Sequence, residues 1–128
     1  MGENKRRHKR VSETFIITYR LKAPFNVKVV LGNTECAAVA IDISEGGLGL
    51  DSTYEIPVSA KVSLHFTLLN ELAATEAERH RVFSLEGESR YCEPTPERGY
   101  RVGVHFTNIT PEQKEHIAGF VRDQSLKG

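Results

Sequence analysis

The feature that most constrains the fold of this chain is an alternation of apolar and polar residues that begins at Thr14. Successive side chains of a strand point to opposite faces, so an apolar residue at every second position predicts a strand with one buried face. Six or seven such strands need a second apolar face to cover them, which favours an antiparallel barrel or sandwich. The clearest sets are Phe15/Ile17/Tyr19/Leu21, Val62/Leu64/Phe66/Leu68 and Tyr100/Val102/Val104/Phe106.

Weaker alternations fill the intervals between these sets. We expect further strands near residues 48–50 and 82–92, while the Tyr100/Val102/Val104/Phe106 set belongs to a strand over 99–107. Glycine-containing turns separate several of them, because glycine and asparagine adopt the backbone angles that tight turns require. The remaining inward-facing sets and their turns are Val27/Val29/Leu31 before Gly32-Asn33, and Val39/Ile41/Ile43 before Glu45-Gly46-Gly47.

The C-terminal segment has a helical pattern instead. Thr110 is the expected N-cap, Pro111 occupies the first helical position, and Gln113 completes a capping box with Thr110. The sequence therefore predicts one amphipathic helix over 111–123, packed on the barrel. Its apolar stripe consists of Ile117, Phe120 and Val121.

Length and charge suggest one domain with a basic arm. A chain of 128 residues can bury about two-thirds of its surface as a single domain. Residues 1–10 carry five basic side chains against one glutamate, a charge of +4, while the remainder carries 12 basic and 16 acidic side chains. We expect a flexible arm over 1–12 and a single barrel domain over 13–128, with a short helix in the Ala- and Glu-rich stretch 70–81. This asymmetry favours a small anionic ligand over a long polyanion.

Several functional classes find no support in the sequence. Cys36 and Cys92 form no CxxC pair, and the histidines lack HxxxH or HExxH spacing, so we expect no metal site. No nucleophile and base can be paired as in an enzyme. There is no apolar run of bilayer length and no signal peptide within residues 1–10, so the expected location is the cytoplasm, without membrane insertion.

The basic arm contains an RxxxR spacing at Arg6 and Arg10. Taken alone, such a basic pentapeptide is more simply explained as a solvated tail. In an extended chain, however, both arginines point to the same side, and guanidinium groups bind phosphate oxygens or the O6/N7 edge of guanine in bidentate fashion. Arg7 and Lys9 fall outside this spacing and are possible secondary ligand contacts.

A second motif, D-x-S-x-x-G, comprises Asp42, Ser44 and Gly47. An ordinary polar turn has the same composition. Asp42 nevertheless falls on the strand face opposite Ile43, and Ser44 shares that outer face if the strand continues so far. A carboxylate there can accept hydrogen bonds from guanine N1–H and the N2 amino group, and glycine lets the backbone approach a flat ligand.

These two motifs, about thirty residues apart and separated by two strand patterns, resemble those of the PilZ family. The segment Tyr100–Phe106 and the C-terminal helix are also similar to that family. The resemblance implies a six-stranded antiparallel β-barrel with a C-terminal helix, which binds cyclic di-GMP and requires no cofactor or catalysis. The ligand-binding residues that it implies are Arg6, Arg10, Asp42, Ser44 and Gly47.

Two other functions stay open at this point. A nucleic-acid-binding barrel would also use a basic arm, although it normally adds exposed aromatic residues, and we expect no nucleic-acid partner here. A PilZ-like scaffold that binds only protein is the other alternative. For a cyclic di-GMP receptor we expect the arm to become ordered on binding and to signal to a downstream protein, from a monomer or a homodimer.

Overall fold

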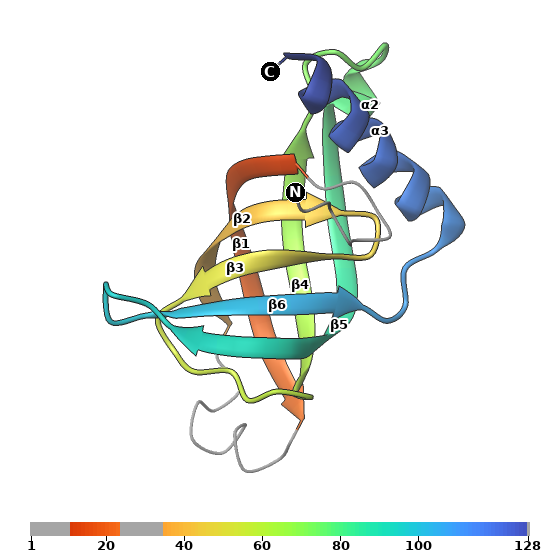
Figure 1. Ribbon diagram of the computed structural model, residues 1–128. Coiled ribbons are helices and arrows are strands. Elements are labelled where there is room, and N and C mark those ends of the chain that lie inside the picture. Colours follow the sequence, from red (N-terminus) through yellow and green to blue (C-terminus); the bar gives the residue numbers. More distant parts are fainter. Residues whose placement is uncertain (1–10, 24–34, 128) are drawn as a thin grey trace, which may run out of the picture.

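A closed antiparallel barrel of six strands forms the body of the molecule (Figure 1). The computed structural model describes residues 11–23 and 35–127. Neighbouring strands around the barrel follow the order β1-β2-β3-β6-β5-β4. The predicted all-β class and six-stranded barrel are therefore confirmed. The strands are β1 (Val11–Ala23), β2 (Cys36–Ser44), β3 (Gly47–Ser52), β4 (Lys61–Leu69), β5 (His80–Pro94) and β6 (Tyr100–Phe106).

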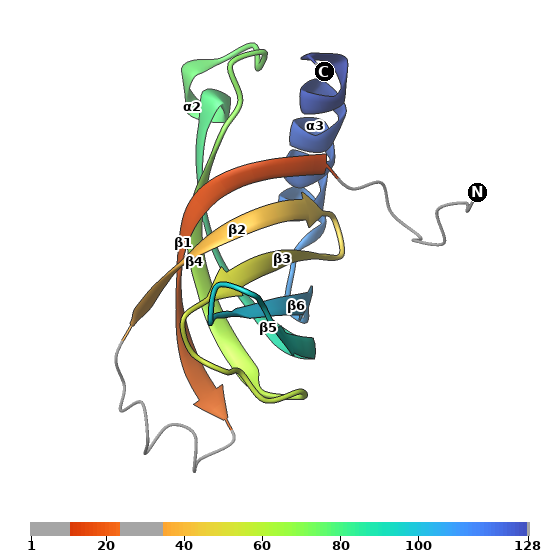
Figure 2. The ribbon, with the colours of Figure 1, turned by 60° about the vertical axis from the view of Figure 1, so that its left-hand side comes forward.

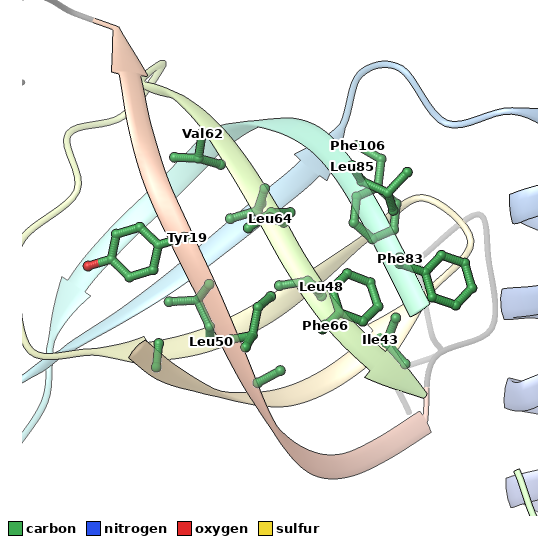
Figure 3. Packing of buried hydrophobic residues seen from close by; sticks show 14 of the residues in the cluster. Tyr19, Ile43, Leu48, Leu50, Val62, Leu64, Phe66, Phe83, Leu85 and Phe106 are labelled. Carbon is green, nitrogen blue, oxygen red and sulfur yellow. The ribbon is translucent and has the colours of Figure 1, made fainter. Parts of the chain in front are cut away.

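The alternating residues of β1, β4 and β6 fill the barrel, as predicted. On β1, Ile17, Tyr19 and Leu21 are buried, and Phe15 packs against the same core from a half-buried position. The phenyl rings of Phe66 and Phe83 stack with their centroids 5.2 Å apart. Figure 3 shows Tyr19, Phe66 and Phe83 with other buried side chains of the same core. Removal of this apolar surface from water is the main force holding the barrel closed.

The predicted inward face of β2 is wrong at its first residue. Ala38 and Ala40 point into the barrel, whereas Val39 is 38% exposed. The pairing of β2 with β3 is irregular between Ala40 and Asp42, so Ile41 is an extra residue, as in a β-bulge. The bulge reverses the alternation and brings Ile43 into the core, where it is fully buried. A parity argument from sequence assumes a regular strand and misses this change.

Helix α3 (Pro111–Lys127) covers part of the barrel and contacts β1 and β2 (Figures 1 and 2). The predicted capping box is present. Thr110 Oγ1 accepts a hydrogen bond from the Gln113 amide at 3.1 Å, and Gln113 Oε1 accepts one from the Thr110 amide at 3.0 Å. The predicted apolar stripe is buried, and the helix extends four residues beyond the predicted end at 123.

The stretch 70–81 contains the short helix predicted for it, α2 (Glu76–Arg79). Thr75 caps α2 by accepting a hydrogen bond from the Glu78 amide. The predicted strand and turn over 27–33 lie outside the described residues, as does the arm over residues 1–10. The boundary expected between arm and barrel stays a prediction.

Candidate functional site

The turn between β2 and β3 is fixed by the Ser44 side chain. Its buried hydroxyl oxygen accepts a hydrogen bond from the Gly46 amide at 3.2 Å and donates one to the Gly47 carbonyl at 3.4 Å. The Gly46 carbonyl in turn accepts a hydrogen bond from the Phe106 amide of β6 at 2.9 Å. Ser44 therefore shapes the turn and is not on an open outer face.

Gly47 allows the turn to approach β6 closely. A Cβ atom at this position would lie 2.1 Å from the Val104 carbonyl oxygen, which is well inside van der Waals contact. Because the obstructing atom belongs to the backbone of a paired strand, it cannot move aside without breaking the sheet. The glycine of the second motif thus has a structural role in this barrel.

The Asp42 carboxylate is held in place at the β2 bulge. Asp42 is half-buried, and its Oδ1 accepts a hydrogen bond from the Gly49 amide of β3 at 3.0 Å. The side chain thereby satisfies a backbone donor opposite the irregular part of β2. A carboxylate oriented in this way is presented at the outer surface of β2 and β3.

A row of residues leads from Asp42 across the outside of four strands. Asp42 pairs with Gly49, Gly49 with Gly103 of β6, and Gly103 with Tyr91 of β5. Directly paired residues point to the same face, so two glycines form a floor between a carboxylate and an aromatic ring. The Tyr91 ring lies over this floor, since a Cβ on Gly103 would be 2.2 Å from Tyr91 Cε2. Tyr91 is 44% exposed.

The next row along these strands carries a cation. Arg101 of β6 pairs with Asp51 of β3, and its Nε and Nη2 atoms both donate to the Asp51 carboxylate. The hydrogen bond with Asp51 raises the pKa of the Arg101 guanidinium, and the charge of Asp42 contributes in the same direction. A permanent positive charge therefore lies within electrostatic reach of Asp42 and Tyr91.

Sequence reasoning did not find Tyr91, Arg101 or Gly103. A signal for Gly103 was available, because the alternation through Tyr100–Phe106 places residue 103 on the outer face of the strand. A glycine at such a position weakens a strand and often marks a place where another group approaches closely. Tyr91 and Arg101 had no comparable signal, since exposed polar positions on strands are common.

The pairing of β1 with β2 places the first residues of β1 beside the second motif. Val11, the first residue of β1, pairs with Ile43, and Ser12 pairs with Asp42. The N-terminal arm is therefore joined to the barrel beside the turn of the second motif. Arg6, Arg7, Lys9 and Arg10 themselves lie outside the described residues.

Other kinds of site receive no support from the part of the chain that the structure describes. There, no three His, Cys, Asp or Glu side chains group as metal ligands. Among these residues, Cys36 and Cys92 form no disulfide, and both are half-buried against the core. None of the described helices is long and apolar enough to cross a membrane.

Fold and site together define a small closed β-barrel domain with a polar, glycine-floored patch on its outer surface. The model of the PilZ domain family matches residues 4–123. This match covers nearly the whole chain, so the protein belongs to the PilZ domain family.

Several solved structures have the same fold. The Bacillus subtilis inhibitor of motility MotI/DgrA matches with a TM-score of 0.70 at 12% identity, over 98% of this chain and 53% of its own. The K. pneumonia MrkH–c-di-GMP complex matches with a TM-score of 0.62 at 13% identity, over 98% and 53%. The chain thus spans about half the length of these two proteins.

The PilZ domain of Escherichia coli YcgR, solved with c-di-GMP, matches along most of both chains. Its TM-score is 0.60 at 13% identity, covering 97% of this chain and 95% of the YcgR domain. No curated protein matches the sequence significantly. At these identities the structural matches establish the fold alone.

Proposed function

We propose that this protein is a receptor domain for cyclic di-GMP, without catalytic activity, that binds the dinucleotide between its N-terminal arm and the β2–β3 turn. The observation that carries the proposal is the pairing of Val11 with Ile43 and of Ser12 with Asp42. It joins the arm that contains Arg6 and Arg10 to the barrel beside Asp42. Membership of the PilZ family and the c-di-GMP named for YcgR and MrkH support the same ligand.

The chemistry of each group suits part of this ligand. Arg6 and Arg10 can bind the phosphates and the O6/N7 edge of guanine through bidentate hydrogen bonds, with Arg7 and Lys9 as secondary contacts. The Asp42 carboxylate can accept hydrogen bonds from guanine N1–H and from the N2 amino group. Ser44 and Gly47 hold the turn in shape, and direct contacts between them and the ligand stay a prediction.

The Tyr91 ring, which lies over Gly103, offers a flat surface on the same outer face as Asp42. We propose that a guanine base lies beside Asp42 and packs against the exposed side of the Tyr91 ring, which itself covers Gly103. Aromatic side chains contribute roughly 1–3 kcal/mol when they stack on a base. Arg101 would add positive charge near the phosphates without having to leave Asp51.

The arm is the proposed signalling element. Fixing five residues from Arg6 to Arg10 costs about 5–10 kcal/mol of backbone entropy. Two bidentate arginines form about four charge-assisted hydrogen bonds, worth roughly 6–12 kcal/mol in total. Because the two quantities are comparable, ligand contacts can decide the position of the arm. Its ordering would then change the surface that a downstream protein meets in the cytoplasm.

Calorimetric titration with cyclic di-GMP and cyclic di-AMP tests the ligand assignment. Adenine offers neither an N1–H nor an N2 amino group to Asp42, so it leaves a desolvated acceptor unpaired at a cost of about 1–3 kcal/mol. We therefore expect binding of cyclic di-GMP that is at least about tenfold tighter than that of cyclic di-AMP. Equal affinities, or no binding of either dinucleotide, would contradict the proposal. The same titration reports the number of ligands bound.

A further inference from the structure

A cavity of about 550 Å³ lies away from the candidate dinucleotide site, between α3, the ends of β4 and β5, and the segment 70–79. We call it the α3 groove. Its floor is apolar and buried, and it consists of Leu68, Phe83 and Phe120. Figure 2 shows α2 and α3 rising on two sides above the barrel, and residues from both helices line the groove.

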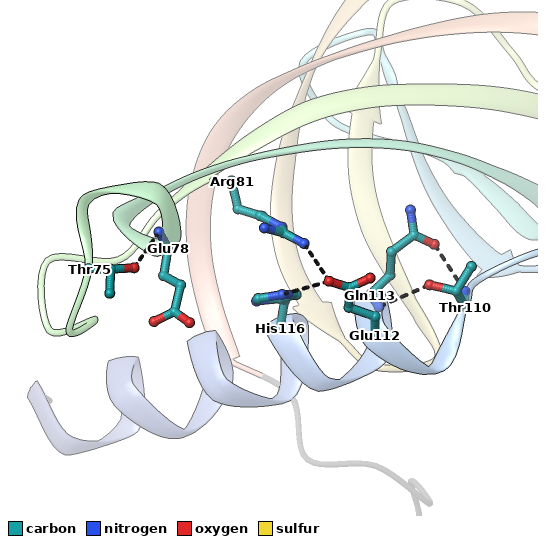
Figure 4. A network of polar contacts seen from close by, with 7 residues as sticks. All are labelled: Thr75, Glu78, Arg81, Thr110, Glu112, Gln113 and His116. Atoms are coloured by element: carbon teal, nitrogen blue, oxygen red, sulfur yellow. Dashed lines mark hydrogen bonds and ion pairs between the residues drawn. The ribbon is translucent and has the colours of Figure 1, made fainter.

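Polar bridges hold the two walls of the groove together. Arg81 of β5 donates to Glu112 at the start of α3 at 3.2 Å (Figure 4). Towards the end of α3, Asn70 Nδ2 donates to Asp123 Oδ2 at 2.9 Å. Glu112 and Asp123 are eleven residues apart, which corresponds to about 16 Å along a helix. The groove is therefore a preformed depression about three helical turns long.

The walls carry excess negative charge. Four carboxylates line the groove, and two of them are paired, Glu112 with Arg81 and Asp123 with Arg122. Glu78 and Glu115 have no ion pair among residues 11–23 and 35–127. In Figure 4 the Glu78 carboxylate points from α2 towards α3. Positive charge at the edges of an occupant would therefore complement Glu78 and Glu115.

Space for apolar side chains is open at the centre of α3. A Cβ atom on Gly119 would meet only Arg122 Nη2, at 3.5 Å, so no side chain fills the groove at this point. Leu72, on the opposite wall, is 52% exposed although it faces the groove. An exposed leucine opposite an unfilled glycine provides the kind of surface on which a partner buries apolar side chains.

From this combination we infer that the α3 groove binds a cationic amphipathic helix of a partner protein. An amphipathic helix inserts apolar anchors at i, i+4 and i+7, which span about 10.5 Å and fit between the two polar bridges. Lysines or arginines beside these anchors would meet Glu78 and Glu115. The inference does not depend on dinucleotide binding, and it can be tested without any dinucleotide.

Fluorescence anisotropy with labelled model peptides tests the inference on the full chain. The probe is a helical peptide of about 14 residues with leucines at three central positions, i, i+4 and i+7, and lysines elsewhere. One control peptide replaces every lysine with glutamate, and the other replaces every leucine with serine. We expect the leucine–lysine peptide to bind at least about tenfold more tightly than either control. Equal binding of all three peptides, or of the two lysine peptides, would overturn the inference.

Variants of the chain assign the binding to the groove. Gly119→Leu fills the open space and is compatible with a helix, and the double change Glu78→Lys with Glu115→Lys reverses the excess charge. Each should weaken peptide binding about tenfold or more. The control is Glu97→Lys, which makes one such Glu-to-Lys change, half the charge change of the double variant, in the exposed β5–β6 turn and should leave the affinity within about twofold.

Two further measurements separate the remaining outcomes. A thermal melt of Gly119→Leu should show no loss of stability, so that its effect reports the groove and not unfolding. Sedimentation should show that the wild-type chain does not associate through this groove. The test is whether any concentration-dependent association of the wild type is lost in Gly119→Leu. Such association would assign the groove to a second copy of this chain and contradict our inference.

Discussion

At the scale of single residues, Asp42 has both a structural contact and a proposed ligand contact. Its carboxylate accepts a hydrogen bond from the Gly49 amide. Asp42→Ala removes this acceptor for a backbone N–H group and should therefore lower the free energy of unfolding by about 1 kcal/mol. Asp42→Asn keeps an acceptor oxygen but loses the charge. We expect both variants to bind cyclic di-GMP at least about tenfold more weakly, while only Asp42→Ala is clearly destabilised.

Titration calorimetry beside denaturant unfolding separates the two roles of Asp42. If Asp42→Asn binds cyclic di-GMP as tightly as the wild type, the carboxylate does not contact guanine. The position of Asp42 in the sequence, outside the apolar faces, predicts that Asp42→Ala leaves stability almost unchanged. The hydrogen bond to Gly49 is the reason why we expect a moderate loss instead.

Gly103 provides a test of the glycine floor. In Gly103→Ala the added Cβ would lie 2.2 Å from Tyr91 Cε2, so the ring must leave its place. Because Tyr91 is exposed, the barrel should tolerate this movement, and we expect an affinity for cyclic di-GMP reduced about tenfold. Gly119→Ala, where a Cβ finds open space, is the control and should bind normally. Unchanged affinity in Gly103→Ala would exclude the floor from the binding surface.

At the scale of elements, the start of α3 depends on the Thr110–Gln113 capping box. Thr110→Ala removes the side-chain acceptor for the Gln113 amide and should lower the free energy of unfolding by about 1 kcal/mol. Urea denaturation measures this loss. Thr107→Ala, an exposed threonine just before the helix, should change stability by less than about 0.5 kcal/mol. Equal losses in the two variants would mean that the cap contributes nothing specific.

The N-terminal arm is the element whose behaviour should change on ligand binding. We predict that hydrogen exchange over residues 4–12 slows when cyclic di-GMP is added. Arg10→Ala should abolish most of this protection and weaken binding, yet leave the thermal melt unchanged, because residue 10 precedes the barrel. Strong protection in the free protein would instead indicate a preformed site, and the proposed ordering would then be wrong.

At the scale of the whole molecule, a buried hydrogen bond across the barrel links stability to pH. The Tyr19 hydroxyl of β1 and the Ser52 hydroxyl at the end of β3 form a hydrogen bond of 2.7 Å. Burial of the phenol raises its pKa to about 12, an effect that the hydrogen bond with Ser52 partly opposes. The unfolded chain deprotonates Tyr19 near pH 10, so the folded state binds this proton more tightly. The stabilisation of the folded state that comes from this proton on Tyr19 is therefore complete below about pH 10. It is lost as the pH rises towards about 12.

The Tyr19→Phe variant tests this linkage. A shift of this size corresponds to about 2–3 kcal/mol, and because the barrel has one core we expect it to appear in the global free energy of unfolding. Wild-type stability should decline between about pH 10 and 12 more steeply than that of Tyr19→Phe, which has no phenol to ionise. Parallel declines, measured by urea denaturation at matched pH, would show that Tyr19 is not responsible.

The sequence by itself determined the features that depend on neighbouring residues. Alternation at every second position identified the inward faces of β1, β4 and β6, because side-chain direction in a regular strand is a local property. The cap of α3 was equally predictable, since Thr110 and Gln113 satisfy each other's backbone donors within one turn. The two motifs, and the family that they resemble, are likewise recognisable from residue types and spacing alone.

Only the tertiary structure decided which distant residues meet. The bulge at Ile41 reversed the face of β2, because a register is set by the partner strands and not by the strand alone. Pairing of Val11 with Ile43 joins the arm to the turn, and pairing through Gly49 and Gly103 brings Tyr91 onto the same outer face as Asp42. These contacts arise from closing the barrel, a non-local event whose entropic cost is offset by burial of the common core.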